Sequence, residues 1–195
     1  MVLTDVRHRL KVSIAMLLLH LLKHGSLVIF LSSMMLATAA ADDISDCNGR
    51  GAQADVQIVA CTRLIDSGRL DRAELPLAYV QRGNAWQDTG DHERAIQDYN
   101  RAIQADRRFA GAYNNRAWAY LQIGRPERGL PDANRAVQLA PQEPNFLDTR
   151  ARILAGLGRK EEAVRDYRAA LALSPNDSSL RESIIRSLHQ LGGRP

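Results

Sequence analysis

Residues 76–109 read PLAYVQRGNAWQDTGDHERAIQDYNRAIQADRRF, and the next two segments repeat their pattern: AGAYNNRAWAYLQIGRPERGLPDANRAVQLAPQE (110–143) and PNFLDTRARILAGLGRKEEAVRDYRAALALSPND (144–177). The three segments are equal in length and align without a gap. Glycine stands at position 15 of each, as Gly90, Gly124 and Gly158, and positions 8, 20 and 27 hold only glycine or alanine. Self-similarity at a fixed period of this length is the sequence signature of a repeat architecture.

Each segment predicts two helices joined by a tight turn. In the second half of the first segment, Ala95, Tyr99 and Ala102 are spaced four and three positions apart, which places them on one face of a helix. The glycine at position 15 ends the first helix, because a left-handed conformation costs little without a Cβ. One hairpin cannot bury its apolar face alone, so neighbouring hairpins stack and share a core.

The period and the residue sizes resemble the tetratricopeptide repeat family, which has small residues at positions 8, 20 and 27 and bulky ones at 4, 11 and 24. The resemblance covers residues 76–177 and implies an all-α fold, an α-solenoid of three full repeats (76–109, 110–143 and 144–177). Two residues depart from the family pattern. Arg107 replaces the usual proline between repeats, and Pro131 lies inside the second helix of the middle repeat. Because an interior proline costs about 3 kcal/mol, we expect that helix to kink or to begin late at Pro131, and its hairpin to be the weakest.

The flanks of the array are predicted to be caps. Residues 42–75 form a degenerate N-terminal repeat with one clear helix from Ala54 to Ile65, and residues 178–195 form an amphipathic C-terminal capping helix. The two cysteines, Cys47 and Cys61, are an even number outside the cytoplasm, which favours one structural disulfide; two free buried thiols are the alternative.

Residues 1–41 are predicted to be a signal peptide. They combine a basic start, the apolar run 27–36 and two A-x-A patterns, which favour cleavage after Ala39 or Ala41. The expected location is therefore the periplasm or the exterior of a bacterial cell, with no membrane association after leader removal. Two alternatives stay open: an uncleaved membrane anchor, and a true start at Met16.

Charge and motifs exclude several functions. Without residues 1–41 the chain has 22 basic and 21 acidic residues, so it lacks the electrostatic footprint of a nucleic-acid-binding protein. His92 and His189 are far apart in sequence and no catalytic motif appears. We therefore expect no enzyme activity, no cofactor and no metal site.

An arginine and an aspartate recur at positions 7 and 23 of every repeat. Charged groups near a packed interface need partners. We interpret them as structural ion pairs, with a ligand-binding ladder of arginines as the alternative. The predicted pairs are Arg82 with Asp98, Arg116 with Asp132, and Arg150 with Asp166.

The resemblance also implies a concave groove lined by the first helix of each repeat. Some family members hold the terminal carboxylates of a peptide there; Asn84 and Asn115 match their amide positions, but their basic positions are Val80, Asn145 and Thr149 here. We expect a protein or peptide partner of other chemistry, bound by a scaffold or adaptor. An envelope assembly factor with an uncleaved leader and, more remotely, a carbohydrate-binding or enzyme-accessory role are the alternatives. The predicted groove residues are Leu77, Val80, Gln81, Asn84, Gln87, Asp88, Asn114, Asn115, Trp118, Leu121, Gln122, Asn145, Asp148, Thr149, Arg152 and Ala155, with Trp118 either an anchor for the partner or packed against the next helix.

Overall fold

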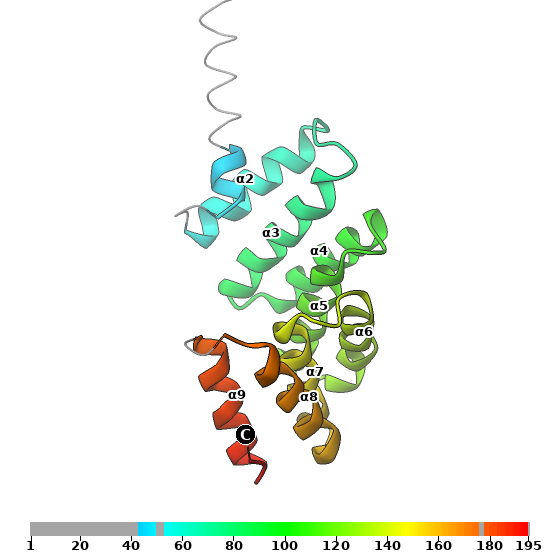
Figure 1. Cartoon of the computed structure of the whole chain (residues 1–195). Helices are drawn as coiled ribbons and strands as arrows, with labels where there is room; N and C mark the ends of the chain where they lie inside the picture. The colour runs from blue at the N-terminus through cyan, green and yellow to red at the C-terminus, as the bar shows by residue number, and fades with distance from the viewer. Residues whose placement is uncertain (1–42, 50–52, 176–177, 195) are drawn as a thin grey trace, which may run out of the picture. The chain divides into compact units, whose positions relative to one another are not determined.

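The computed structural model describes residues 43–49, 53–175 and 178–194 (Figure 1). The chain divides into two compact units, Met1–Asp43 and Ile44–Pro195. The predicted signal peptide lies outside the described residues. Within the described residues, no helix has the length and apolar character that crossing a membrane requires.

The described part of Ile44–Pro195 contains helices and loops but no strand. A short helical segment at 43–47 comes first. The helices that follow are α2 (Ala54–Asp66), α3 (Glu74–Asp88), α4 (His92–Ala105), α5 (Ala110–Gln122), α6 (Pro126–Leu139), α7 (Pro144–Gly156), α8 (Lys160–Leu173) and α9 (Ser179–Gln190).

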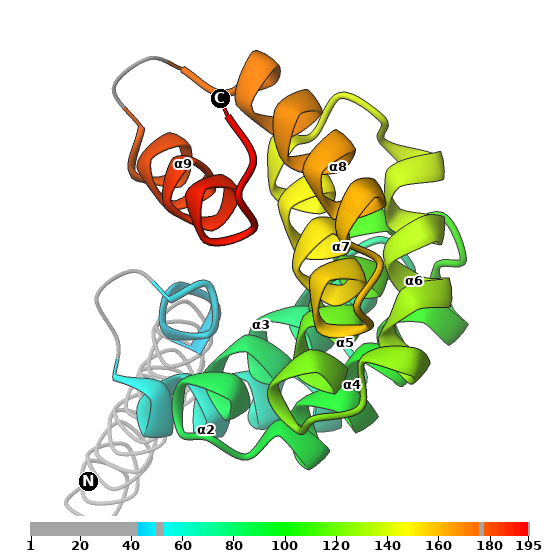
Figure 2. The ribbon, with the colours of Figure 1, turned by 90° about the horizontal axis from the view of Figure 1, so that it is seen from below.

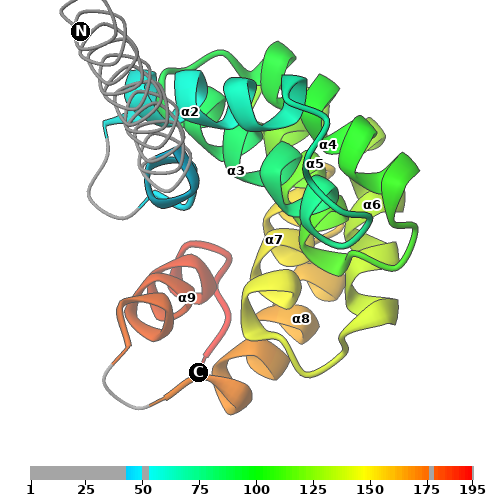
Figure 3. The same ribbon diagram turned by 90° about the horizontal axis from the view of Figure 1, so that it is seen from above.

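The helices form a stack of antiparallel hairpins. The pairs α3 and α4, α5 and α6, and α7 and α8 correspond to the three repeats, and every helix also packs against the next one along the chain. Helix α5 contacts both α3 and α7 directly. Figures 2 and 3 show the helices following one another round a curve, with α3, α5 and α7 on its inner side. The fold is thus the expected α-solenoid, with the first helix of each repeat lining one face.

The turn inside each hairpin depends on its glycine. Gly124 has a φ of 70°, a conformation that residues with a Cβ rarely adopt. Its N–H donates to the carbonyl of Leu121, and the N–H of Arg125 donates to the carbonyl of Tyr120, which is the hydrogen-bond pattern of a Schellman cap. Gly192, after α9, repeats this geometry one full repeat length beyond Gly158. The capping helix therefore ends like the first helix of a repeat.

The late start predicted for the second helix of the middle repeat is wrong. Helix α6 begins at Pro126 and continues through Pro131 to Leu139. Pro126 occupies the first turn, where a missing N–H costs nothing. Pro131 is exposed, so water can hydrate the carbonyl that loses its partner. The relative weakness of this hairpin stays a prediction.

The core runs along the whole stack. Tyr99, in the first hairpin, and Ile153, in the last hairpin, are both fully buried in this core. At the C-terminal end, Ile184 and Leu188 of α9 are also fully buried, in a cluster with Leu154 of α7. The amphipathic face of α9 therefore covers the apolar surface that the last hairpin would otherwise expose.

Candidate ligand-binding groove

The arginines and aspartates at positions 7 and 23 form bidentate ion pairs within each hairpin. The guanidinium of Arg82 lies 2.8 Å from both carboxylate oxygens of Asp98. The corresponding distances are 2.7 and 2.6 Å from Arg116 to Asp132 and 2.6 and 2.8 Å from Arg150 to Asp166. The hydrogen bonds that Arg82 donates to Asp98 raise the pKa of Arg82 above its usual value, and burial opposes this effect. These pairs join the two helices of each repeat by bidentate, charge-assisted hydrogen bonds, which are about twice as strong as hydrogen bonds between neutral groups.

The same arginines also contact the preceding hairpin. The Nη1 atom of Arg116 donates to Asn100 of α4 at 2.5 Å, and that of Arg150 donates to Asn134 of α6 at 3.5 Å. In the first repeat, Nη1 of Arg82 donates to the hydroxyl of Thr62 in α2 at 3.0 Å. Each guanidinium is therefore occupied on both sides by groups of the chain itself, as a structural role requires.

Thr62 shows how the degenerate N-terminal unit fits the array. It takes the place that Asn100 and Asn134 hold in the following units, because it bonds the arginine of the next hairpin in the same way. Asn100 and Asn134 are one repeat length apart, and Thr62 precedes Asn100 by more than that. The extra length lies between Thr62 and Arg82. The connection from Ser67 to Ala73 is longer than the connection between α4 and α5, and α3 begins at Glu74, before the repeat boundary at residue 76.

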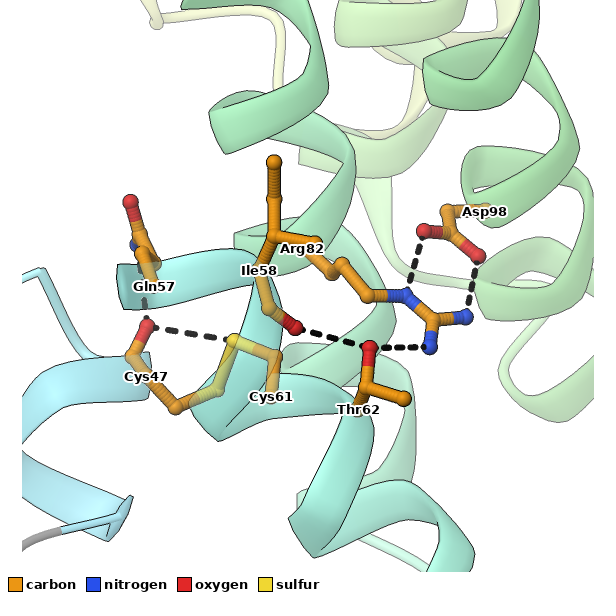
Figure 4. Close-up of a disulfide and its surroundings, with 7 residues drawn as sticks. All are labelled: Cys47, Gln57, Ile58, Cys61, Thr62, Arg82 and Asp98. Carbon is orange, nitrogen blue, oxygen red and sulfur yellow. Dashed lines mark hydrogen bonds and ion pairs between the residues drawn. A yellow bond between two sulfur atoms is a disulfide. The ribbon is translucent and has the colours of Figure 1, made fainter. Parts of the chain in front are cut away.

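The expected disulfide between Cys47 and Cys61 is present, with an S–S distance of 2.10 Å and a Cα–Cα distance of 4.7 Å (Figure 4). Both cysteines are buried. The side chain of Gln57 donates to the carbonyl of Cys47 at 2.9 Å, which adds a second link between the segment 43–47 and α2. The disulfide therefore holds the N-terminal cap on α2, and Thr62 connects α2 to the first ion pair.

A chain of side-chain amides runs across the inner helices. The Oδ1 atom of Asn84 accepts two hydrogen bonds, from the hydroxyl of Tyr99 at 2.9 Å and from Nδ2 of Asn115 at 2.8 Å. Asn114 in turn donates to Oδ1 of Asn115 at 3.3 Å. The two asparagines that match the family's amide positions are therefore connected directly, and they orient each other.

Next to these amides, α5 and α7 enclose a hollow of about 440 Å³. Trp118 is half-buried in its wall and belongs to none of the buried core clusters. The guanidinium of Arg152 lies 5.8 Å from the centre of the Trp118 ring. The hollow is lined by Asn114, Asn115, Trp118, Asn145, Phe146, Asp148 and Thr149.

The polar groups around the hollow are unevenly satisfied. Arg152 pairs with Oδ2 of Asp148 at 2.7 Å and donates to the hydroxyl of Ser183 in α9 at 3.0 Å. The other carboxylate oxygen of Asp148 and Oδ1 of Asn114 are buried, and neither has a hydrogen-bond partner within the described part of the chain. In α3, the side-chain oxygen of Gln87 is also buried without a hydrogen-bond partner in the described part of the chain. Buried acceptors without donors cost about 1–3 kcal/mol each.

The structure corrects two of the predicted groove residues. Val80 is 6% exposed and belongs to the buried cluster around Tyr99, because an apolar side chain at that position packs between helices. Leu77 is exposed but lines a separate small hollow beside Cys47 and Leu64. Leu121 and Ala155 are half-buried against the core. Of the remaining predicted residues, those of the second and third repeats that line the hollow are Asn114, Asn115, Trp118, Asn145, Asp148 and Thr149. A groove position for the others stays a prediction.

Phe146 lines the hollow but is not among the predicted residues. A signal for it exists in the sequence. Position 3 is alanine in the first two repeats, Ala78 and Ala112, and becomes phenylalanine only in the third. Phe146 is half-buried, so the larger side chain packs against the C-terminal core cluster and also lines the hollow.

The fold and the hollow define a helical-repeat protein whose inner face carries an open hollow. Two family models match the chain, one described as TPR repeat over residues 83–124 and one as tetratricopeptide repeat over 112–194. Together they span the array from α3 to α9. The chain belongs to the tetratricopeptide repeat family.

Solved structures agree with this assignment. The first TPR domain of human RPAP3 is 27% identical over 60% of this chain and 91% of its own, with a TM-score of 0.56. The second TPR domain of human RPAP3, in complex with the HSP70 peptide SGPTIEEVD, is 28% identical over 61% of this chain and 98% of its own, with a TM-score of 0.55. MamA from Desulfovibrio magneticus RS-1 shares the fold, with 14% identity over 79% of this chain and 93% of its own and a TM-score of 0.63. No curated protein matches the sequence.

Proposed function

We propose that the unit Ile44–Pro195 is a protein-interaction module that holds a segment of a partner protein against the hollow between α5 and α7. The observation that carries this proposal is Trp118, a half-buried aromatic side chain in the wall of an open hollow, surrounded by amide groups. Such aromatic residues dominate the binding energy of protein interfaces. The amides of Asn115 and Asn145 can bond the main chain of an extended segment. The peptide bound to the second TPR domain of RPAP3 supports this kind of use for the fold.

The proposed location is the periplasm or the cell exterior. The signal-peptide pattern of residues 1–41 and the disulfide support it, because disulfides persist in oxidising compartments. Mass spectrometry of the native protein tests the location. A chain that begins at Ala40 or Asp42 is expected, whereas an intact leader would favour the membrane-anchored assembly factor.

The binding role is tested with Trp118→Ala. The variant and the wild-type protein are immobilised and exposed to an extract of the periplasm, and the captured proteins are compared. We expect the variant to lose about 2 kcal/mol of binding free energy, roughly a thirtyfold weaker affinity, since truncated hot-spot residues cost at least this much.

Leu173→Ala is the matched control, because Leu173 is an exposed apolar residue at the end of α8 and does not line the hollow. It should capture the same partner as the wild type. Circular dichroism must show equal helicity in both variants. Equal capture by the Trp118 variant, or its loss of helicity, would contradict the proposed role of the hollow.

A further inference from the structure

The hollow between α5 and α7 combines aromatic walls with oxygen acceptors that lack donors. Trp118 and Phe146 supply the aromatic surface, and Asp148 and Asn114 supply the buried unpaired oxygens. Asp148 is 8% exposed, yet only one of its two oxygens is hydrogen-bonded within the described part of the chain. The final torsion of an aspartate side chain is soft. Turning it moves both oxygens, so a donor that enters the hollow reaches this carboxylate in competition with Arg152.

The chain itself shows which chemical group this arrangement accepts. The guanidinium of Arg152 lies over the Trp118 ring and bonds Asp148 at the same time. A cation above an aromatic face and beside a carboxylate is stabilised by both. Arg152 uses one oxygen of Asp148, and the second oxygen is buried without a donor in the described part of the chain.

The charge of the cation seen at the hollow is already paired. In the described ranges, Arg152 is the basic side chain shown bonded to a residue that lines the hollow: its Nε donates to Asp148, and its Nη2 donates to Ser183. A carboxylate entering the hollow would meet Asp148 and the oxygen of Asn114, both acceptors. Such a ligand would leave the unpaired oxygens unsatisfied and would add repulsion.

We propose that the hollow binds a basic side chain, lysine or arginine, of the partner segment. Its aliphatic stem lies against Trp118 and Phe146, and its charged end donates to Asp148 and Asn114. This inference rests on the proposed function, since it names the chemistry of the residue that the partner inserts into that same hollow. It sets this protein apart from the RPAP3 domain, whose bound peptide SGPTIEEVD is acidic.

Immobilised synthetic peptides test the inference. Four sets carry lysine, arginine, glutamine or glutamate at the centre, between randomised uncharged residues. We expect the wild-type protein to bind the lysine and arginine sets about tenfold more strongly than the glutamate set, as one hydrogen bond to a charged group allows. Glutamine, a neutral donor, should lie between them.

Two variants are expected to act in opposite directions. Asp148→Asn removes the charge but keeps the shape, so it should abolish the advantage of the basic peptides over the glutamine peptides. Arg152→Gln removes the internal cation that competes for Asp148, so it should strengthen the binding of the basic peptides. A merely structural role of this pair predicts that both variants weaken all binding equally. Glu127→Gln is the control, because Glu127 is an exposed carboxylate in the first turn of α6 and does not line the hollow.

The outcomes separate this inference from the proposed function. Strongest binding of the glutamate set, or weaker binding of basic peptides by Arg152→Gln, overturns the basic-ligand inference while peptide binding itself stands. If no set binds the wild type better than it binds Trp118→Ala, the proposed function fails and the inference fails with it. Should Asp148→Asn lose its helical structure, Arg152→Gln alone decides between the two directions.

Discussion

Gly83→Ala tests how closely the two helices of the first repeat approach. A Cβ built on Gly83 in α3 would lie 2.6 Å from Cε1 and 3.0 Å from Cδ1 of Tyr99 in α4, well inside van der Waals contact. The ring cannot move away freely, because Tyr99 is fully buried and its hydroxyl donates to Asn84. The same substitution would be harmless if the helices were merely adjacent.

The size of the effect follows from two costs and one opposing gain. Overpacking a core costs about 1–3 kcal/mol, and replacing glycine by alanine inside a helix returns about 1 kcal/mol. A displaced Tyr99 also weakens its hydrogen bond to Asn84, worth about 1 kcal/mol. We therefore expect Gly83→Ala to lower the free energy of unfolding by about 1–3 kcal/mol.

Urea denaturation followed by circular dichroism measures this change, with Gly156→Ala as the matched control. Gly156 also lies in a first helix, α7, but its Cβ would meet no atom closer than 3.6 Å, an ordinary contact. The control should be unchanged or more stable by up to about 1 kcal/mol. If Gly83→Ala were as stable as Gly156→Ala, the tight contact between α3 and the Tyr99 ring would be refuted.

Two further predictions concern the N-terminal half of the array. Reduction of the disulfide, or the double change Cys47→Ala and Cys61→Ala, should lower the free energy of unfolding by about 3 kcal/mol, since the bond closes a loop of this length; equal urea midpoints with and without reductant would contradict this. Burial raises the pKa of Tyr99 above its usual value of 10.0, so the folded state keeps a proton that the unfolded state loses, and this contribution to stability is complete below about pH 10 and declines as the pH rises further. Urea midpoints measured on both sides of that pH should show the decline in the wild type and less of it in Tyr99→Phe.

The helical ends were largely predictable, because each depends on a local signal that recurs with the period. Gly124 and its equivalents end the first helices by adopting a positive φ, a conformation that a glycine at this repeat position predicts. Helix α3, however, begins at Glu74, before the predicted repeat boundary at residue 76. Asp71 accepts from the N–H of Glu74, whose own carboxylate accepts from the N–H of Asp71. This is a capping box, a pattern that can be read from D-x-x-E.

The lining of the groove was less predictable. The position of a residue in a helix shows which face its side chain lies on, but not how deeply neighbouring helices bury it. Val80 stands at a position that faces the groove in the family, yet it is buried with Tyr99 in the first repeat. The pairing of Asp148 with Arg152 could be anticipated from their i, i+4 spacing. The second oxygen of Asp148 lacks a donor in the described part of the chain. This could not be predicted from the sequence, because it depends on which side chains of α5 and α9 reach that oxygen.

The distribution of charge within the array explains why the arginines that recur in every repeat are not free for a partner. Every repeat places an arginine at position 7, but each guanidinium is held by an aspartate of its own hairpin and by a polar side chain of the preceding one, as Arg116 is by Asp132 and Asn100. These arginines stabilise the register of the hairpins, and removing Arg116 would leave Asp132 buried without its ion-pair partner. A partner that approached with carboxylates would have to compete for them against bidentate bonds. A partner that brings donors meets oxygens that the chain has left unpaired, so the stabilisation of the solenoid and the selectivity of its groove follow from the same use of arginine.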